Sequence, residues 1–113
     1  MKVPASSLAT STLTIVEVRS ALVRATRSRR LTPRGFRAAK NTAALLAAEL
    51  YLVETDHSLL DDAAEFAERH VLRAIEAIHL ASARALRDPE VVIATWDREL
   101  RTAANAEGLR IAA

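Results

Sequence analysis

The sequence predicts an α/β fold in which helices flank a parallel sheet. Predicted strands and helices alternate along the 113 residues, an order typical of parallel strands joined by helices. Residues 91–95 are β-branched and apolar on both faces, as a central parallel strand must be. The chain has 24 alanines but only 2 glycines and 3 prolines, which favours a helix-rich chain over a turn-rich all-β fold. This length suits one domain spanning residues 1–113.

Helices and strands follow in turn after residues 1–10, where no regular element is expected. Ser11 or Thr12 caps the first helix, whereas Thr32 caps the second and is followed by a proline suited to its first position. An Asp-Pro pair ends the fourth helix, and Gly108 ends the fifth. The five helices are predicted from about residue 13 to the arginine-rich turn at 27–30, and over residues 33–48, 58–69, 72–86 and 97–106. The three strands are predicted at residues 50–53, 91–95 and 109–111.

Positive charge is concentrated in residues 19–40. This segment has eight cations and no acid, whereas residues 41–113 have seven cations and 13 acids. Such a local excess attracts phosphate backbones or an acidic partner. The simpler interpretation is a solvated basic face.

Several classes of protein are excluded by what the sequence lacks. There is no cysteine, which excludes a disulfide framework, a thiolate zinc site and a cysteine nucleophile. The two glycines are isolated, so no glycine-rich phosphate loop exists. Residues 3–7 are too polar for a signal peptide, and the longest apolar stretch, residues 42–53, is too short to span a membrane. A cytoplasmic protein without a membrane anchor is expected.

Three carboxylates lie in apolar surroundings, where a charge must be compensated by a cation or by hydrogen-bond donors. They are Glu17, Glu76 and Asp97. Asp97 follows the strand at residues 91–95, and open parallel sheets bind ligands beyond the carboxyl ends of their strands. If the other two acids reach the same end, the cluster suits Mg²⁺ or Mn²⁺. Such an ion can activate water for the hydrolysis of a phosphodiester.

Each acid also has a structural interpretation. Glu17 would lie on the polar side of its helix or pair with Arg19 or Arg24. Glu76 would pair with Arg73 or Arg69, or accept a hydrogen bond from His79. Asp97 would cap the helix that follows it. His79 lies on the same apolar helix as Glu76 and is expected to be a core residue with its hydrogen bonds satisfied.

Three segments carry these acids, in order TSTLTIVEVRSAL at residues 10–22, LRAIEAIHLASA at 72–83 and VIATWDREL at 92–100. Together they resemble the PIN-domain family and, within it, the VapC-like toxins of bacterial toxin–antitoxin pairs. The resemblance implies a Rossmann-like parallel sheet and a ribonuclease that depends on Mg²⁺ or Mn²⁺. It assigns the role of metal ligands to Glu17, Glu76 and Asp97. It also implies a homodimer, and an antitoxin whose C-terminal tail covers the acidic pocket.

The sequence departs from the family pattern in two ways. The family's first acid is an Asp on an N-terminal strand, yet only 16 residues precede Glu17 and none of them is acidic. The first strand and helix are therefore expected to be missing, so the chain is expected to be N-terminally truncated. Glu76 stands where the family usually has Asp, and its extra methylene moves the carboxylate by about 1.5 Å. A misplacement of about 1 Å can cost about a hundredfold in rate.

The leading hypothesis is a truncated VapC-like endoribonuclease toxin whose basic segment, residues 19–40, steers RNA toward the three acids. A second hypothesis is a non-catalytic PIN remnant that binds an antitoxin. A third is a basic helical nucleic-acid-binding protein unrelated to PIN domains. Binding without metal and with a steep salt dependence would favour the third.

Overall fold

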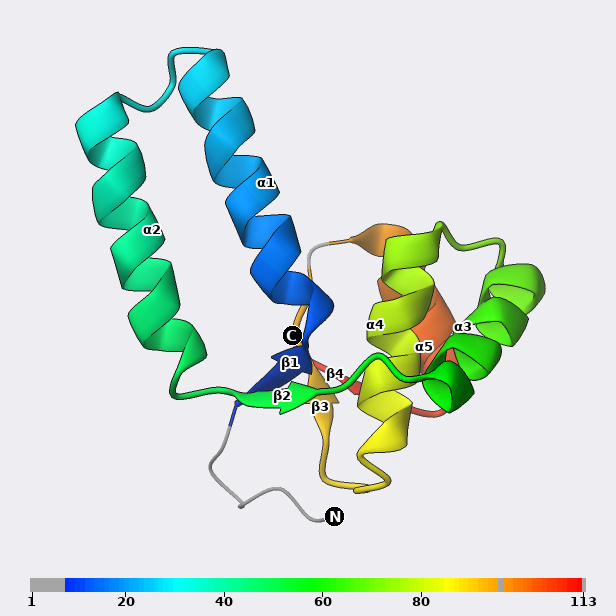
Figure 1. Ribbon diagram of the computed structural model, residues 1–113. Helices are drawn as coiled ribbons and strands as arrows, with labels where there is room; N and C mark the ends of the chain where they lie inside the picture. The colour runs from blue at the N-terminus through cyan, green and yellow to red at the C-terminus, as the bar shows by residue number, and fades with distance from the viewer. Residues whose placement is uncertain (1–7, 96, 113) are drawn as a thin grey trace.

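The computed structural model describes residues 8–95 and 97–112, so Trp96 of the third motif lies outside the described residues. Helices and short strands alternate along this part of the chain (Figure 1). The helices are α1 (Leu13–Arg27), α2 (Pro33–Ala47), α3 (His57–His70), α4 (Ala74–Ala85) and α5 (Arg98–Ala106). The strands are β1 (Ala9–Ser11), β2 (Tyr51–Val53), β3 (Val92–Ile93) and β4 (Arg110–Ile111).

The strands form two separate parallel pairs within the described residues, β1 with β2 and β3 with β4. The α/β class is confirmed, because every pair is parallel and helices connect the strands. The expectation of a central strand buried on both faces is wrong. β3 covers only two residues, and 47% of the surface of Val92 is exposed. In a two-stranded sheet each strand is an edge, so apolar residues on both faces do not ensure burial there.

β1 was not expected, because residues 1–10 show no apolar alternation. Its last residue, Ser11, pairs with Val53 and is 1% exposed. The Ser11 hydroxyl accepts a hydrogen bond from the backbone N–H of Leu13 at 3.1 Å. Ser11, rather than Thr12, therefore supplies the side-chain cap of α1.

α1 and α2 form a hairpin that stands away from the other helices (Figure 1). The predicted start of α2 is confirmed, because the Thr32 hydroxyl accepts from Gly35 N at 2.9 Å and Pro33 is the first helical residue. Neither helix has a buried residue. The hairpin therefore draws little stability from core packing.

The hydrophobic core lies among α3, α4 and α5. Leu80 of α4 is fully buried, and the fully buried Ala104 lies on α5. The other buried apolar residues are Leu59, Ala63, Phe66, Leu72, Ala77, Ala81, Leu100 and Ala103. No helix of the described residues is long and apolar enough to cross a membrane.

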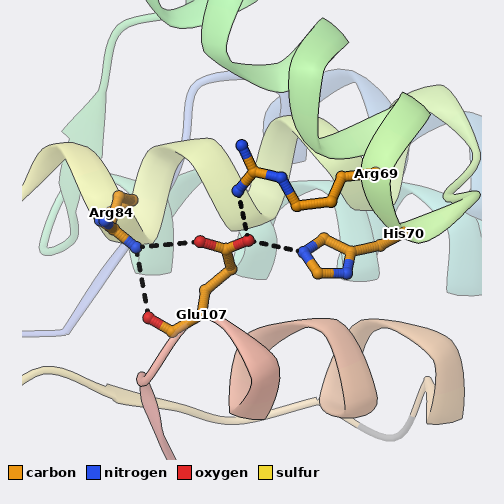
Figure 2. A network of polar contacts seen from close by, with 4 residues as sticks. All are labelled: Arg69, His70, Arg84 and Glu107. Atoms are coloured by element: carbon orange, nitrogen blue, oxygen red, sulfur yellow. Dashed lines mark hydrogen bonds and ion pairs between the residues drawn. The ribbon is translucent and has the colours of Figure 1, made fainter.

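A polar network joins the C-terminal ends of these three helices (Figure 2). Glu107, which follows α5, accepts hydrogen bonds from Arg69 at 2.6 Å and pairs with His70 at 2.7 Å, both through Oε2. Arg84 reaches Oε1 and the backbone carbonyl of Glu107. Arg69 and Arg84 lie in the last turns of α3 and α4, where the helix dipole favours positive charge.

Candidate functional site

The three candidate acids come from three helices. Glu17 lies on α1, Glu76 lies in the first turn of α4, and Asp97 is the N-cap of α5. Glu17 follows the end of β1, and Asp97 follows the end of β3. Two of the acids thus lie beyond the carboxyl ends of parallel strands, where α/β sheets place ligand sites.

Glu76 and Asp97 converge on one cation. Arg73 Nε donates to Glu76 Oε1 at 2.8 Å, and Arg73 Nη2 lies 3.8 Å from Asp97 Oδ2. The Glu76 side chain is 13% exposed and that of Asp97 is 31% exposed. The hydrogen bond with Glu76 raises the pKa of Arg73, and the charges of Glu76 and Asp97 add to this shift. The guanidinium therefore balances a carboxylate pair that is partly shielded from water.

The two oxygens of Asp97 have different partners. Oδ1 accepts from the backbone N–H of Leu100 at 2.8 Å and so caps α5. Oδ2 faces Arg73. The capping interpretation of Asp97 and the pairing of Glu76 with Arg73 are both confirmed. Capping uses only one oxygen, so the other remains available to a cation.

Glu17 pairs with His79 rather than with an arginine of its own helix. His79 Nε2 lies 2.6 Å from Glu17 Oε1, and the two side chains are 26% and 33% exposed. His79 is therefore half-buried and bound to a carboxylate, not a core residue. The sequence carried a signal for this role, because residues 73, 76 and 79 are spaced i, i+3, i+6 and share one side of α4.

The donor set fits a divalent cation in kind. Carboxylate oxygens are the ligands that Mg²⁺ and Mn²⁺ prefer, and Glu76 and Asp97 already share one cation. Glu17 is turned to His79 instead. Within residues 8–95 and 97–112, no three His, Asp or Glu side chains are close enough together to hold a metal ion.

A cavity of ≈850 Å³ lies between the two strand pairs. Its wall includes β1, residues of β3 and one side of α4. The residues that line it include Leu8, Ser82, Leu86 and Ile93. None of the three acids lines it, but His79 does. His79 therefore lies in the cavity wall and also contacts Glu17, one of the three candidate acids.

The cations of residues 19–40 lie on the α1–α2 hairpin, and all eight are exposed. In the described part of the chain none of them pairs with an acid; Arg24 and Arg30 instead donate to the hydroxyls of Ser20 and Ser28. The hairpin is thus an exposed basic arm with no internal neutralisation. It can attract a negatively charged partner.

Comparison with known proteins gives one consistent result. The family model described as PIN domain matches residues 2–106. Ribonuclease VapC45 of Mycobacterium tuberculosis (strain CDC 1551 / Oshkosh) is 40% identical over 102 residues, which is 90% of this chain and 71% of the relative. Ribonuclease VapC49 of Mycobacterium tuberculosis (strain ATCC 25618 / H37Rv) has the same identity and coverage.

Proposed function

The chain belongs to the PIN-domain family as a VapC-like member, and from this premise we propose that it is a metal-dependent endoribonuclease toxin. The observation that carries the proposal is the convergence of Glu76 and Asp97 on one cation. These two acids belong to the motifs that resemble the family's acidic segments. The reaction would be hydrolysis of an RNA phosphodiester bond.

Glu76 and Asp97 would hold the divalent cation, Mg²⁺ or Mn²⁺, and Glu17 would complete the ligand set. A bound ion of this kind supplies an activated water and stabilises the charge that develops on the phosphate. Asp97 would contribute Oδ2, because Oδ1 is held by the N–H of Leu100. The cap fixes the Asp97 side chain, which favours a pre-organised ligand.

Two further side chains of this site, Arg73 and His79, have positioning roles. Arg73 would leave the acids when the metal binds, which it can do readily because its side chain is 79% exposed. His79 would hold Glu17 beside α4 through their 2.6 Å contact. Neither side chain is required to act as a nucleophile.

The exposed basic arm, residues 19–40, would steer RNA toward the acids by long-range attraction of phosphates. By likeness to the VapC ribonucleases, the proposal also includes a cognate antitoxin, a homodimer and action in the cytoplasm. The antitoxin would keep the nuclease inactive until it is removed.

The experiment is RNA cleavage by the purified chain with Mg²⁺ or Mn²⁺, with a chelator as control. We expect cleavage that requires the metal and is abolished in Asp97→Asn. Asp61→Asn is the matched control, because Asp61 lies on α3 with a side chain 72% exposed. Cleavage that survives the chelator or Asp97→Asn would contradict the assigned site.

A non-catalytic remnant that binds an antitoxin is the second candidate. It is favoured by the contacts that all three acids make with side chains of this chain, Glu76 and Asp97 with Arg73 and Glu17 with His79. The expected result is then no cleavage at any metal concentration from a chain whose circular dichroism shows that it is folded. Measured binding to a co-expressed antitoxin would complete this assignment.

A further inference from the structure

β1 and β3 each have one edge without a neighbouring strand in the described part of the chain. β1 pairs with β2 alone, and β3 pairs with β4 alone. Residues of both β1 and β3 line the cavity of ≈850 Å³ that lies between the two pairs. We call this cavity the strand gap. Two short sheets thus end at the same space.

The hydrogen bonds of β1 show which of its backbone groups face the strand gap. The carbonyl of Leu8 and the N–H of Thr12 both bond to β2. Successive residues of a strand direct their N–H and C=O groups to opposite sides of the strand, so the backbone groups of Ala9 and Ser11 point away from β2. Ala9 and Ser11 both line the strand gap, which therefore receives these groups.

The same alternation applies to β3. The carbonyl of Ile93 accepts a hydrogen bond from the N–H of Ala112, beside β4. The backbone groups of Val92 and Ala94 therefore point away from β4, and both residues line the strand gap. An edge of this kind is a template for one more strand. The strand gap has such an edge from each of two sheets.

α4 and α5 give the strand gap an apolar wall. Ala83 and Leu86, at the C-terminal end of α4, and Leu100 of α5 line it. Leu8 and Val92 add apolar surface that is 74% and 47% exposed. A polypeptide strand has the two kinds of group that this space lacks, which are backbone groups for the edges and apolar side chains for the wall.

The volume of the strand gap also suits a strand. A residue in a packed sheet takes about 3.3 Å along its strand, about 4.8 Å between strands and about 10 Å between layers, or roughly 160 Å³. The cavity of ≈850 Å³ therefore holds a strand of about five residues. This is the commonest strand length in proteins.

We propose that the strand gap binds an extended apolar segment of a second polypeptide, which pairs with β1 on one side and with β3 on the other. The bound segment would join the two pairs into one continuous sheet. The proposal rests on the strand edges and the cavity, and it does not depend on nuclease activity.

The unpaired backbone groups decide among the occupants. A helix bonds its own backbone groups and would leave both edges unpaired. A second copy of this chain has, in its described part, only strands of two or three residues, each already paired. Donating one of them would break an existing pair. An extended segment of another polypeptide satisfies both edges without such a loss.

The test uses the whole chain and two synthetic peptides, measured by fluorescence anisotropy without metal or RNA. The probe is a fluorescein-labelled peptide with about five alternating valines and isoleucines, flanked by lysines for solubility. The second peptide has the same side chains but carries methyl groups on alternate backbone nitrogens, which removes donors needed for strand pairing. We expect the probe to bind, and the methylated peptide to bind more weakly by about tenfold or more.

Val92→Pro is the main variant, because proline removes the N–H that β3 directs into the strand gap. We expect it to weaken binding of the probe by about tenfold. Leu52→Pro is the matched control. Its neighbours Tyr51 and Val53 bond toward β1, so the N–H of Leu52 lies on the far edge of β2. Leu52→Pro should bind the probe as the original chain does, and circular dichroism shows whether both variants remain folded.

Hydrogen exchange of the original chain keeps the proposal falsifiable if Val92→Pro unfolds. We expect the probe to slow exchange of the Ala9 and Val92 amides by about tenfold or more and to leave that of Leu52 unchanged. Equal binding of the two peptides, equal loss in Leu52→Pro, or unchanged exchange at Ala9 and Val92 overturns the proposal. A monomer–dimer equilibrium that the probe and Val92→Pro both abolish would also overturn it, by assigning the strand gap to a second copy. RNA cleavage is measured separately, so failure here is distinguishable from failure of the nuclease proposal.

Discussion

His79 Nε2 on α4 lies 2.6 Å from Glu17 Oε1 on α1, although the two residues are 62 positions apart. The contact joins the α1–α2 hairpin, which forms the exposed basic arm, to α4, the helix that also carries Glu76. It also sets the direction of the Glu17 carboxylate, which is one of the three motif acids. A side chain that the family resemblance did not assign to the site thus determines where one of its acids points.

We expect His79→Ala to lower the kcat/KM of RNA cleavage by about tenfold, because Glu17 loses the group that orients it. The free energy of unfolding should fall by about 1 kcal/mol, which is the typical contribution of one hydrogen bond, because this contact is only part-buried. His79→Gln retains a donor at a similar distance and should restore most of the activity. Urea unfolding and initial cleavage rates check both. Unchanged kcat/KM in His79→Ala would show that Glu17 needs no positioning.

Asp97 has two roles that substitution separates. Asn is as good an N-cap as Asp, so Asp97→Asn should change the melting temperature little while it abolishes cleavage. Asp97→Ala also removes the bond to Leu100 N and should lower the free energy of unfolding by about 1 kcal/mol. Thermal melts of the two variants check the difference. Equal melting temperatures would mean that α5 does not depend on its cap.

The local parts of this site could be predicted from the sequence. The cap formed by Asp97 and the pairing of Glu76 with Arg73 each involve residues at most three positions apart, so helix geometry fixes them. The start of α2 at Pro33 is fixed in the same way by Thr32. The class α/β followed from the alternation of elements.

The long-range parts could not be predicted. The contact between Glu17 and His79 depends on how α1 and α4 pack, and no pattern along the chain encodes that. β1 is short and has no apolar alternation; it is a strand because its backbone pairs with β2. The exposure of Val92 likewise depends on the number of strands in its sheet, not on its own apolar character.

The Glu107 network predicts a loss of stability in acid. Its hydrogen bond with His70, supported by Arg69, holds the pKa of Glu107 below its ordinary value of 4.5, although burial opposes the shift. Unfolding returns the pKa to that value, so the unfolded chain takes up the proton first as the pH falls. The stability that Glu107 contributes is complete above about pH 4.5 and is lost as the pH falls through the folded-state pKa.

Glu107→Gln should therefore lower the free energy of unfolding by about 2 kcal/mol near neutral pH and by less in acid. Urea unfolding at several pH values measures this. Glu90→Gln is the control, because the Glu90 side chain is 82% exposed and its pair with Arg110 contributes little. A constant difference between Glu107→Gln and the original chain at every pH would contradict the network's role.

Arg73 should compete with the metal, since it lies between Glu76 and Asp97. We expect Arg73→Gln to tighten Mn²⁺ binding by about threefold or more, because the carboxylates lose the cation that now balances them. Isothermal titration with Mn²⁺ measures this without RNA. Arg98→Gln is the control. It also removes one positive charge near Asp97, but Arg98 forms no ion pair in the described structure. Equal tightening in both variants would show a general effect of net charge.

The packing of α4 predicts the largest loss of stability. Leu80 is fully buried in the core formed with α3 and α5. Leu80→Ala removes buried methyl groups and leaves a cavity, so the free energy of unfolding should fall by about 3 kcal/mol. Leu60→Ala, at a leucine 42% exposed, should cost less than about 1 kcal/mol. Urea unfolding of the two variants measures the difference. Equal losses of stability in the two variants would mean that the core does not centre on α4. If Leu80→Ala also loses RNA cleavage while Leu60→Ala retains it, the loss follows from unfolding of α4, the helix that holds Glu76.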